Sequence, residues 1–175
     1  MQLKLITHPP FAFVRGLRVF RIIGIFVSGI GIFFVLLQSS WILDHVVGPL
    51  AVSLAWVVQG ILSVLGEPVY QSGSCVASTA VSMEITPACT GLYQIAFLIS
   101  AILSWPATAW KRWHGIAAGV ITLLTLNIIR LLSIYFCALT FPAAIPFLHD
   151  LLWETLMILF VPLIWLSWAW YFSES

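Results

Sequence analysis

Residues 85–103 read ITPACTGLYQIAFLISAIL, and this stretch passes from a polar, proline-containing loop into a long apolar segment. Cys89 lies where the loop becomes the segment. A thiol at the start of a helix meets unpaired N–H groups and the positive end of the helix dipole, and both favour the nucleophilic thiolate. Thr90 and Gly91 leave little bulk around the sulfur, so a carbonyl carbon can approach it. The alternative is that Cys89 is a small apolar residue that caps a membrane helix.

The composition indicates a polytopic membrane protein. Hydrophobic residues make up 62% of the 175 residues and charged residues 7%, which excludes a water-soluble globule. The net charge of +1 provides no basic stripe for phosphates, so we expect no nucleic-acid partner. The three cysteines form no CxxC pair and the four histidines form no HExxH motif, so we expect neither a metal nor an organic cofactor.

The apolar runs predict an all-α bundle of four to five transmembrane helices. The expected spans are residues 19–37, 46–65, 89–110, 116–139 and 150–171. Run 46–65 is ambiguous, because Ser53, Gln59 and Ser63 fall on one mildly polar face. This segment either spans the membrane or lies tilted in the interface.

Basic residues predict the orientation of the bundle. They lie before or at the start of the first span and between the third span and the fourth: Lys4, Arg15, Arg18, Arg21, Lys111 and Arg112. The positive-inside rule places both groups on the cytoplasmic side of a bacterial inner membrane. Three full crossings cannot join two cytoplasmic points, so one of the first three segments does not cross normally, or the N-terminus is outside.

Residues 66–88 form the only long polar stretch, and they predict a short extended or β-hairpin flap. Partial alternation in 70–76 and 81–86, with a Ser72-Gly73 turn signal, supports strands. Such backbone belongs outside the hydrocarbon, so we expect the flap on the outer face above Cys89. Cys75 in this flap could form a disulfide, and pairing with Cys89 would silence the nucleophile.

Arg130 is the most conspicuous residue of the predicted span 116–139. An arginine inside a bilayer costs roughly 3 kcal/mol on insertion scales, so its presence needs a reason. Asn127 lies one turn earlier on the same helix face, so both side chains can reach one polar cavity. Glu154, about one turn into the last span, is the obvious counter-ion, and a structural salt bridge is the alternative role for Arg130.

His149 enters the last span at the same outer level as Cys89. Its alternative role is that of an ordinary interfacial histidine. The adjacent Asp150 is expected to point elsewhere, so we assign it no part in a triad. A thiol, a guanidinium and an imidazole from three helices are thus expected to converge on the outer face.

In this order the residues resemble the exosortase/archaeosortase family, in its compact exosortase H type. The resemblance covers residues 62–165. Its motifs are the LLxxLG-like entry at 61–66, the flap, Glu84, the ACTG tetrapeptide where ACSG is commoner, the NIIR ending at Arg130, and the histidine after it. The chain departs from larger members in having fewer spans.

The resemblance implies one exosortase-like domain over residues 1–175 that acts as a cysteine peptidase or transpeptidase. Its implied partners are exported proteins ending in a sorting motif, an apolar helix and a basic tail, with membrane lipid and a glycan or lipid acceptor. The implied catalytic residues are Cys89 as nucleophile, Arg130 as electrostatic stabiliser and His149 as acid/base. The implied supporting residues are Asn127, Glu154, Glu84, Thr90 and Gly91.

Two other functions stay open from the sequence. One is a quinone-linked thiol oxidoreductase that uses Cys75 and Cys89, although the absence of CxxC argues against it. The other is a non-enzymatic assembly or lipid-binding subunit, in which Arg130 and Glu154 only hold the bundle together.

Overall fold

The computed structural model describes the backbone of residues 11–173 and the side chains of residues 19–171. Lys4 and the side chains of Arg15 and Arg18, which contributed to the predicted orientation, therefore lie outside the described residues. The elements are α1 (Phe11–Leu37), α2 (Ser40–Ile42), π-helix η1 (Leu43–Val47), α3 (Gly48–Val64), β1 (Tyr70–Ser72), β2 (Cys75–Ala77), β3 (Ser82–Glu84), 3-10 helix η2 (Pro87–Thr90), α4 (Leu92–Ser104), α5 (Ala109–Thr140), η3 (Pro142–Ala144), π-helix η4 (Phe147–Trp153) and α6 (Glu154–Ser173).

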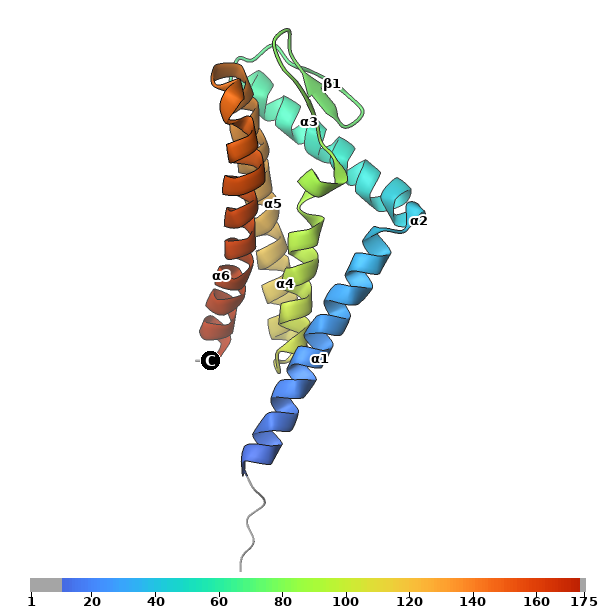
Figure 1. Cartoon of the computed structure of the whole chain (residues 1–175), viewed down its shortest axis with the longest axis vertical. Coiled ribbons are helices and arrows are strands. Elements are labelled where there is room, and N and C mark those ends of the chain that lie inside the picture. Colours follow the sequence, from blue (N-terminus) through green and yellow to red (C-terminus); the bar gives the residue numbers. More distant parts are fainter. Residues whose placement is uncertain (1–10, 174–175) are drawn as a thin grey trace, which may run out of the picture.

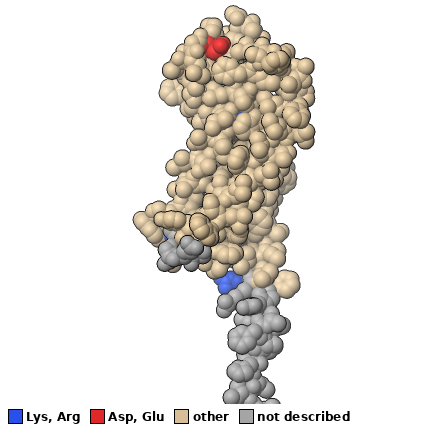
Figure 2. Space-filling view, turned by 90° about the vertical axis from the view of Figure 1, so that its left-hand side faces the viewer, with Lys and Arg blue, Asp and Glu red and all other residues tan. Residues whose placement is uncertain are grey.

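The fold is that of an all-α polytopic membrane protein with a small strand flap, as predicted. Four helical stretches are long and apolar enough to cross a membrane: Val19–Leu37, Ser40–Val64, Ala109–Thr140 and Pro142–Tyr171. On the face drawn in Figure 2, acidic atoms appear only near the upper end and basic atoms only near the lower end. The long uncharged surface between them suits contact with lipid.

The helices do not all follow one direction (Figure 1). Helices α1, α4, α5 and α6 run roughly along the long axis, whereas α3 runs obliquely across the upper end. Its buried residues fall on one face of the helix: Ala51, Leu54, Ala55, Val58 and Leu62. One face of α3 therefore packs inward, against β2 and α5. The segment whose course was ambiguous in the sequence is the one that departs from the bundle axis.

Helix α4 is shorter than the predicted segment 89–110. It has 13 residues, about 20 Å of helix, whereas the hydrocarbon core is about 30 Å thick. It ends before Pro106 because the residue preceding a proline disfavours helical geometry, and Trp105 is extended, with ψ 138°. Helix α5 already begins at Ala109 instead of residue 116, so Lys111 and Arg112 lie in its first turn and not in a loop.

The flap is a three-stranded antiparallel sheet in the order β1-β2-β3. The predicted strand 70–76 is divided, because Gly73 takes a φ of +60° and the chain reverses so that Ser72 pairs with Cys75. A second turn closes at Ser78, whose backbone N–H donates to the carbonyl of Val81 at 2.7 Å. The sheet lies at the upper end beside α3 (Figure 1).

Two buried clusters form the core. One joins α3, the flap, η2 and α5, and it includes Val58, Leu62, Val76, Ile85, Cys89, Leu131 and Tyr135. The other joins α4, α5, η4 and α6, and it includes Leu98, Ile102, Leu123, Trp153, Met157 and Trp168. Cys89 therefore packs in the first cluster, together with residues of the flap, shortly before α4 begins.

Candidate active site

Cys89 lies in the short 3-10 turn η2 and not in the first turn of α4. Gly91 takes a left-handed conformation, with φ +78°, and so separates the two helices. The backbone N–H of Cys89 donates to the carbonyl of Thr86 at 2.9 Å. Cys89 thus lies where loop becomes helix, but in a separate 3-10 turn before α4 and with its own N–H paired.

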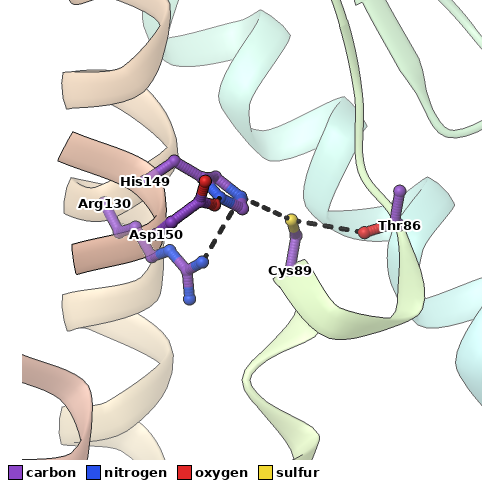
Figure 3. A network of polar contacts seen from close by, with 5 residues as sticks. All are labelled: Thr86, Cys89, Arg130, His149 and Asp150. Atoms are coloured by element: carbon purple, nitrogen blue, oxygen red, sulfur yellow. Dashed lines mark hydrogen bonds and ion pairs between the residues drawn. The ribbon is translucent and has the colours of Figure 1, made fainter. Parts of the chain in front are cut away.

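Five polar side chains, Thr86, Cys89, His149, Arg130 and Asp150, form a network of contacts (Figure 3). The Thr86 hydroxyl donates to the sulfur of Cys89 at 3.4 Å, and this sulfur lies 3.5 Å from Nε2 of His149. On the other side of the ring, His149 Nδ1 lies 2.6 Å from the carboxylate of Asp150. The expectation that Asp150 points elsewhere is wrong, because the π-helix η4 turns its side chain back onto the neighbouring ring.

These contacts define the neutral tautomer of His149. A carboxylate oxygen only accepts hydrogen bonds, so Nδ1 carries the proton and Nε2 presents a lone pair. That lone pair faces both the Cys89 thiol and an N–H of Arg130, whose NH2 atom is also 3.5 Å away. The imidazole is thus placed to take the proton of the thiol.

Arg130 is 4% exposed and lies in the second half of α5. Among the described residues it makes no ion pair, and the predicted salt bridge to Glu154 is absent. Trp153, the residue before Glu154, faces α5, and its Nε1 donates to Ser133 Oγ at 2.7 Å. Successive residues of a helix point in different directions, so Glu154 faces away from α5 and from Arg130. Arg130 instead contacts His149.

The environment of Cys89 favours its thiolate. Burial alone raises the pKa of the thiol. The hydrogen bonds to Thr86 and His149 and the positive charge of Arg130 outweigh this effect, so the pKa of Cys89 lies below its ordinary value. The site therefore provides a nucleophile with an adjacent base, the combination needed for acyl transfer.

Asn127 holds the turn that carries the thiol. It is fully buried, and its Nδ2 atom donates to the carbonyl oxygen of Cys89 at 2.9 Å. It also packs against Gly91, where an added Cβ would lie 3.4 Å from the Asn127 amide carbon. Asn127 and Arg130 thus reach the same turn region from one face of α5.

The other residues predicted to support the site are placed differently. Thr90 is buried and closes η2 by donating to the carbonyl of Pro87 at 2.7 Å. Glu84 is exposed on β3, and Glu154 is exposed on α6. Neither contacts the network of side chains around Cys89.

The cysteines of the chain are all free. Cys75 lies on β2 and its sulfur is 3.3 Å from the hydroxyl of Ser82 across the sheet. The disulfide required for the thiol oxidoreductase hypothesis is therefore not present. Within the described residues, no group of three His, Cys, Asp or Glu side chains could hold a metal ion.

Sequence reasoning missed Thr86 and Asp150. A signal for Thr86 was present, since a threonine directly before a proline at the start of a helix is a typical capping position. Asp150 was considered only on regular α-helical geometry, which the π-helix overrides.

Comparison with known proteins identifies a family. A model described as transmembrane exosortase matches residues 11–169, nearly the whole chain. No curated protein and no solved structure matches it.

Proposed function

Because the chain belongs to the transmembrane exosortase family, we propose that it is a membrane-embedded cysteine peptidase or transpeptidase. Its substrates are exported proteins that end in a sorting motif, an apolar helix and a basic tail. It removes this signal and transfers the new C-terminus to a cell-envelope acceptor. The observation that carries the proposal is the contact between Cys89 Sγ and His149 Nε2 at 3.5 Å.

The first step forms a thioester. His149 Nε2 takes the thiol proton, and the Cys89 sulfur attacks the peptide carbonyl carbon, so that a C–S bond forms and the carbonyl oxygen becomes an oxyanion. The C–N bond then breaks, and the imidazolium returns its proton to the departing amine. Asp150 keeps the ring in the tautomer that this exchange needs.

Arg130 supplies a positive charge that stabilises the negative oxyanion. It is a buried guanidinium without a carboxylate partner among the described residues, and an uncompensated buried charge is costly. The transient oxyanion is a complementary anion, so the attraction is strongest in the transition state, where it accelerates the reaction.

The second step resolves the thioester. An amine or hydroxyl of a glycan or lipid attacks the acyl carbon, His149 takes its proton, and the C–S bond breaks to regenerate the thiol. If water attacks the acyl carbon instead, the same site acts as a protease. We place the site on the periplasmic or exterior side of a bacterial inner membrane, where exported proteins and envelope acceptors meet. The steps draw on side chains alone and need no cofactor.

The test uses purified protein in liposomes with a co-encoded exported protein that ends in a motif, an apolar helix and a basic tail. We expect wild type to shorten this protein and to form an adduct on Cys89 that hydroxylamine releases. Cys89→Ser should retain its fold and lose nearly all processing, because a hydroxyl is a poorer nucleophile. Cys75→Ser is the matched control and should remain active.

The outcome also separates the alternatives. Full processing by Cys89→Ala would overturn the proposal and favour an assembly subunit. Loss of activity in Cys75→Ser, together with a Cys75–Cys89 disulfide detected by mass spectrometry, would favour the oxidoreductase.

A further inference from the structure

An apolar groove of about 840 Å³ lies where α1, α4 and α6 meet. Helix α4 contacts both neighbours and lies between them, so it forms the floor and the other two form the walls (Figure 1). The lining residues extend over 22–34 on α1, 93–104 on α4 and 154–165 on α6. Each stretch corresponds to about 17 Å of helix, so the groove has the length of three helical turns.

The groove is open at its sides, and its upper end is lined by residues that closely follow the candidate active site in sequence. Ile158 on one wall is 61% exposed and Phe34 on the other is 54% exposed. At its upper end Tyr93 follows Cys89 closely in sequence, and Glu154 follows His149 closely. A rod lying in the groove would therefore have its upper end about one helical turn along the chain from the segments that carry Cys89 and His149.

Polar groups occur at this upper end without partners. Glu154 lines the groove, is exposed, and makes no hydrogen bond or ion pair with the described residues. Gln94 also lines the groove, and its Oε1 atom is buried without a hydrogen-bond partner in the described part of the chain. An ionisable side chain at membrane depth normally has a partner, so the occupant must carry donors at this end. Lipid acyl chains carry none.

We propose that the groove binds the apolar transmembrane helix of the protein substrate, with the N-terminal turn of that helix against Glu154. The first four N–H groups of a helix have no internal partner, and they carry the positive end of its dipole. A carboxylate is therefore complementary to this end and repels the opposite one. The inference rests on the proposed function and adds the place and polarity of substrate binding.

This polarity places the peptide bond to be cleaved. A helix with its N-terminus at Glu154 emerges from the groove beside Cys89, so the residues preceding the helix pass the nucleophile. Its basic C-terminal tail then lies at the lower end, on the same side of the membrane as Lys111 and Arg112. A helix of the reverse direction would present carbonyl groups to Glu154.

Photo-crosslinking in a bacterial membrane tests this arrangement. A benzophenone amino acid replaces Phe97 or Ile158 in the groove, and Ile121, exposed on α5 outside it, serves as the control position. The protein carries Cys89→Ala, so that binding is measured without chemistry. The co-expressed probe is a leucine-alanine helix with a polar N-terminal lead outside and a lysine tail in the cytoplasm, and a second probe has the reverse orientation.

We expect crosslinks to the first probe from positions 97 and 158 and not from 121, and weak crosslinks to the reversed probe. Glu154→Gln should lower the yield about two- to ten-fold, the range expected for a charge at a helix end. Thr155→Val, which alters a neighbour outside the groove lining, should leave the yield unchanged.

Equal yields from position 121, crosslinks from the groove to phospholipid only, or no effect of Glu154→Gln would overturn the inference. These results are independent of catalysis. Processing that fails while the crosslinks persist would refute the proposed function alone, and crosslinks that fail while processing persists would refute the groove alone.

Discussion

At the scale of single residues, the reactivity of Cys89 depends on groups from three parts of the chain. Thr86 comes from the preceding loop, His149 from η4 and Arg130 from α5. Thr86 and Arg130 stabilise negative charge on the sulfur, and His149 does so once its ring has taken the thiol proton. Together they outweigh the effect of burial on the pKa of Cys89. Removing one of them should therefore raise the pKa of the Cys89 thiol while the fold is retained.

The first prediction concerns the pH dependence of Cys89 alkylation. The thiolate is the reactive form, so a lowered pKa means that alkylation by iodoacetamide reaches half its maximal rate below about pH 8.5, the value of a free thiol. Thr86→Val removes one hydrogen bond to the sulfur and should move this midpoint upward. The measurement uses a Cys75→Ser/Cys137→Ser background. A midpoint that is unchanged in Thr86→Val would contradict the role of this hydroxyl.

The second prediction concerns Arg130→Lys. If Arg130 binds the oxyanion, the planar guanidinium is required, and lysine should lower processing about 10²- to 10³-fold with little change in thermal stability in detergent. Glu154→Gln should not change that stability through Arg130, because the two make no salt bridge. A lysine variant that processes substrate at the wild-type rate would reduce Arg130 to a structural role.

At the scale of elements, the site depends on the join between η2 and α4. Gly91 reverses the chain there with a positive φ, and Asn127 packs against it while holding the carbonyl of Cys89. A Cβ at this position would only touch Asn127 at ordinary contact distance, but the left-handed backbone conformation is one that L-residues rarely adopt. The join thus couples the position of the sulfur to α5.

The third prediction compares two glycines. Gly91→Ala should destabilise the protein by about 1–2 kcal/mol, the cost of a left-handed conformation for an L-residue, and should lower processing because Cys89 shifts. Gly60→Ala is the control, since Gly60 lies within α3 with no atom within 4 Å of an added Cβ, and alanine favours helix. Unfolding in detergent and alkylation of Cys89 measure the two effects. Equal behaviour of the two variants would refute the argument.

At the scale of the whole molecule, the oblique course of α3 determines the topology. With α3 across the upper end, the axial helices alternate in direction, so the start of α1, the α4–α5 connection and the end of α6 lie at the lower end (Figure 1). The flap and Cys89 lie toward the other end. This arrangement is consistent with basic residues at Arg21, Lys111 and Arg112 on one side.

The fourth prediction tests this topology with single cysteines in a cysteine-free background. Ser82→Cys on the flap should react with an impermeant maleimide added outside intact cells, because Ser82 is exposed. Trp113→Cys, at an exposed position near the start of α5, should react only after the membrane is opened. Labelling of both positions from the same side would show that the orientation is wrong.

Much of this protein follows from its sequence alone. The membrane class follows from composition, because a chain this apolar cannot remain in water, and the flap follows from its polarity and turn residues. Cys89, Arg130 and His149 stand out because each is chemically unusual for its surroundings. These inferences concern single residues and local periodicity, which do not require knowledge of distant contacts.

Other features were decided only by the tertiary structure. Glu154 is not the partner of Arg130 because Trp153 takes the side of the turn facing α5, and Asp150 reaches His149 because a π-helix replaces regular helix. The oblique α3 likewise reflects packing on β2 and α5, which its own apolarity does not specify. The physical reason is that hydropathy determines which segments leave water, whereas the direction of each side chain depends on which neighbours fill the space around it.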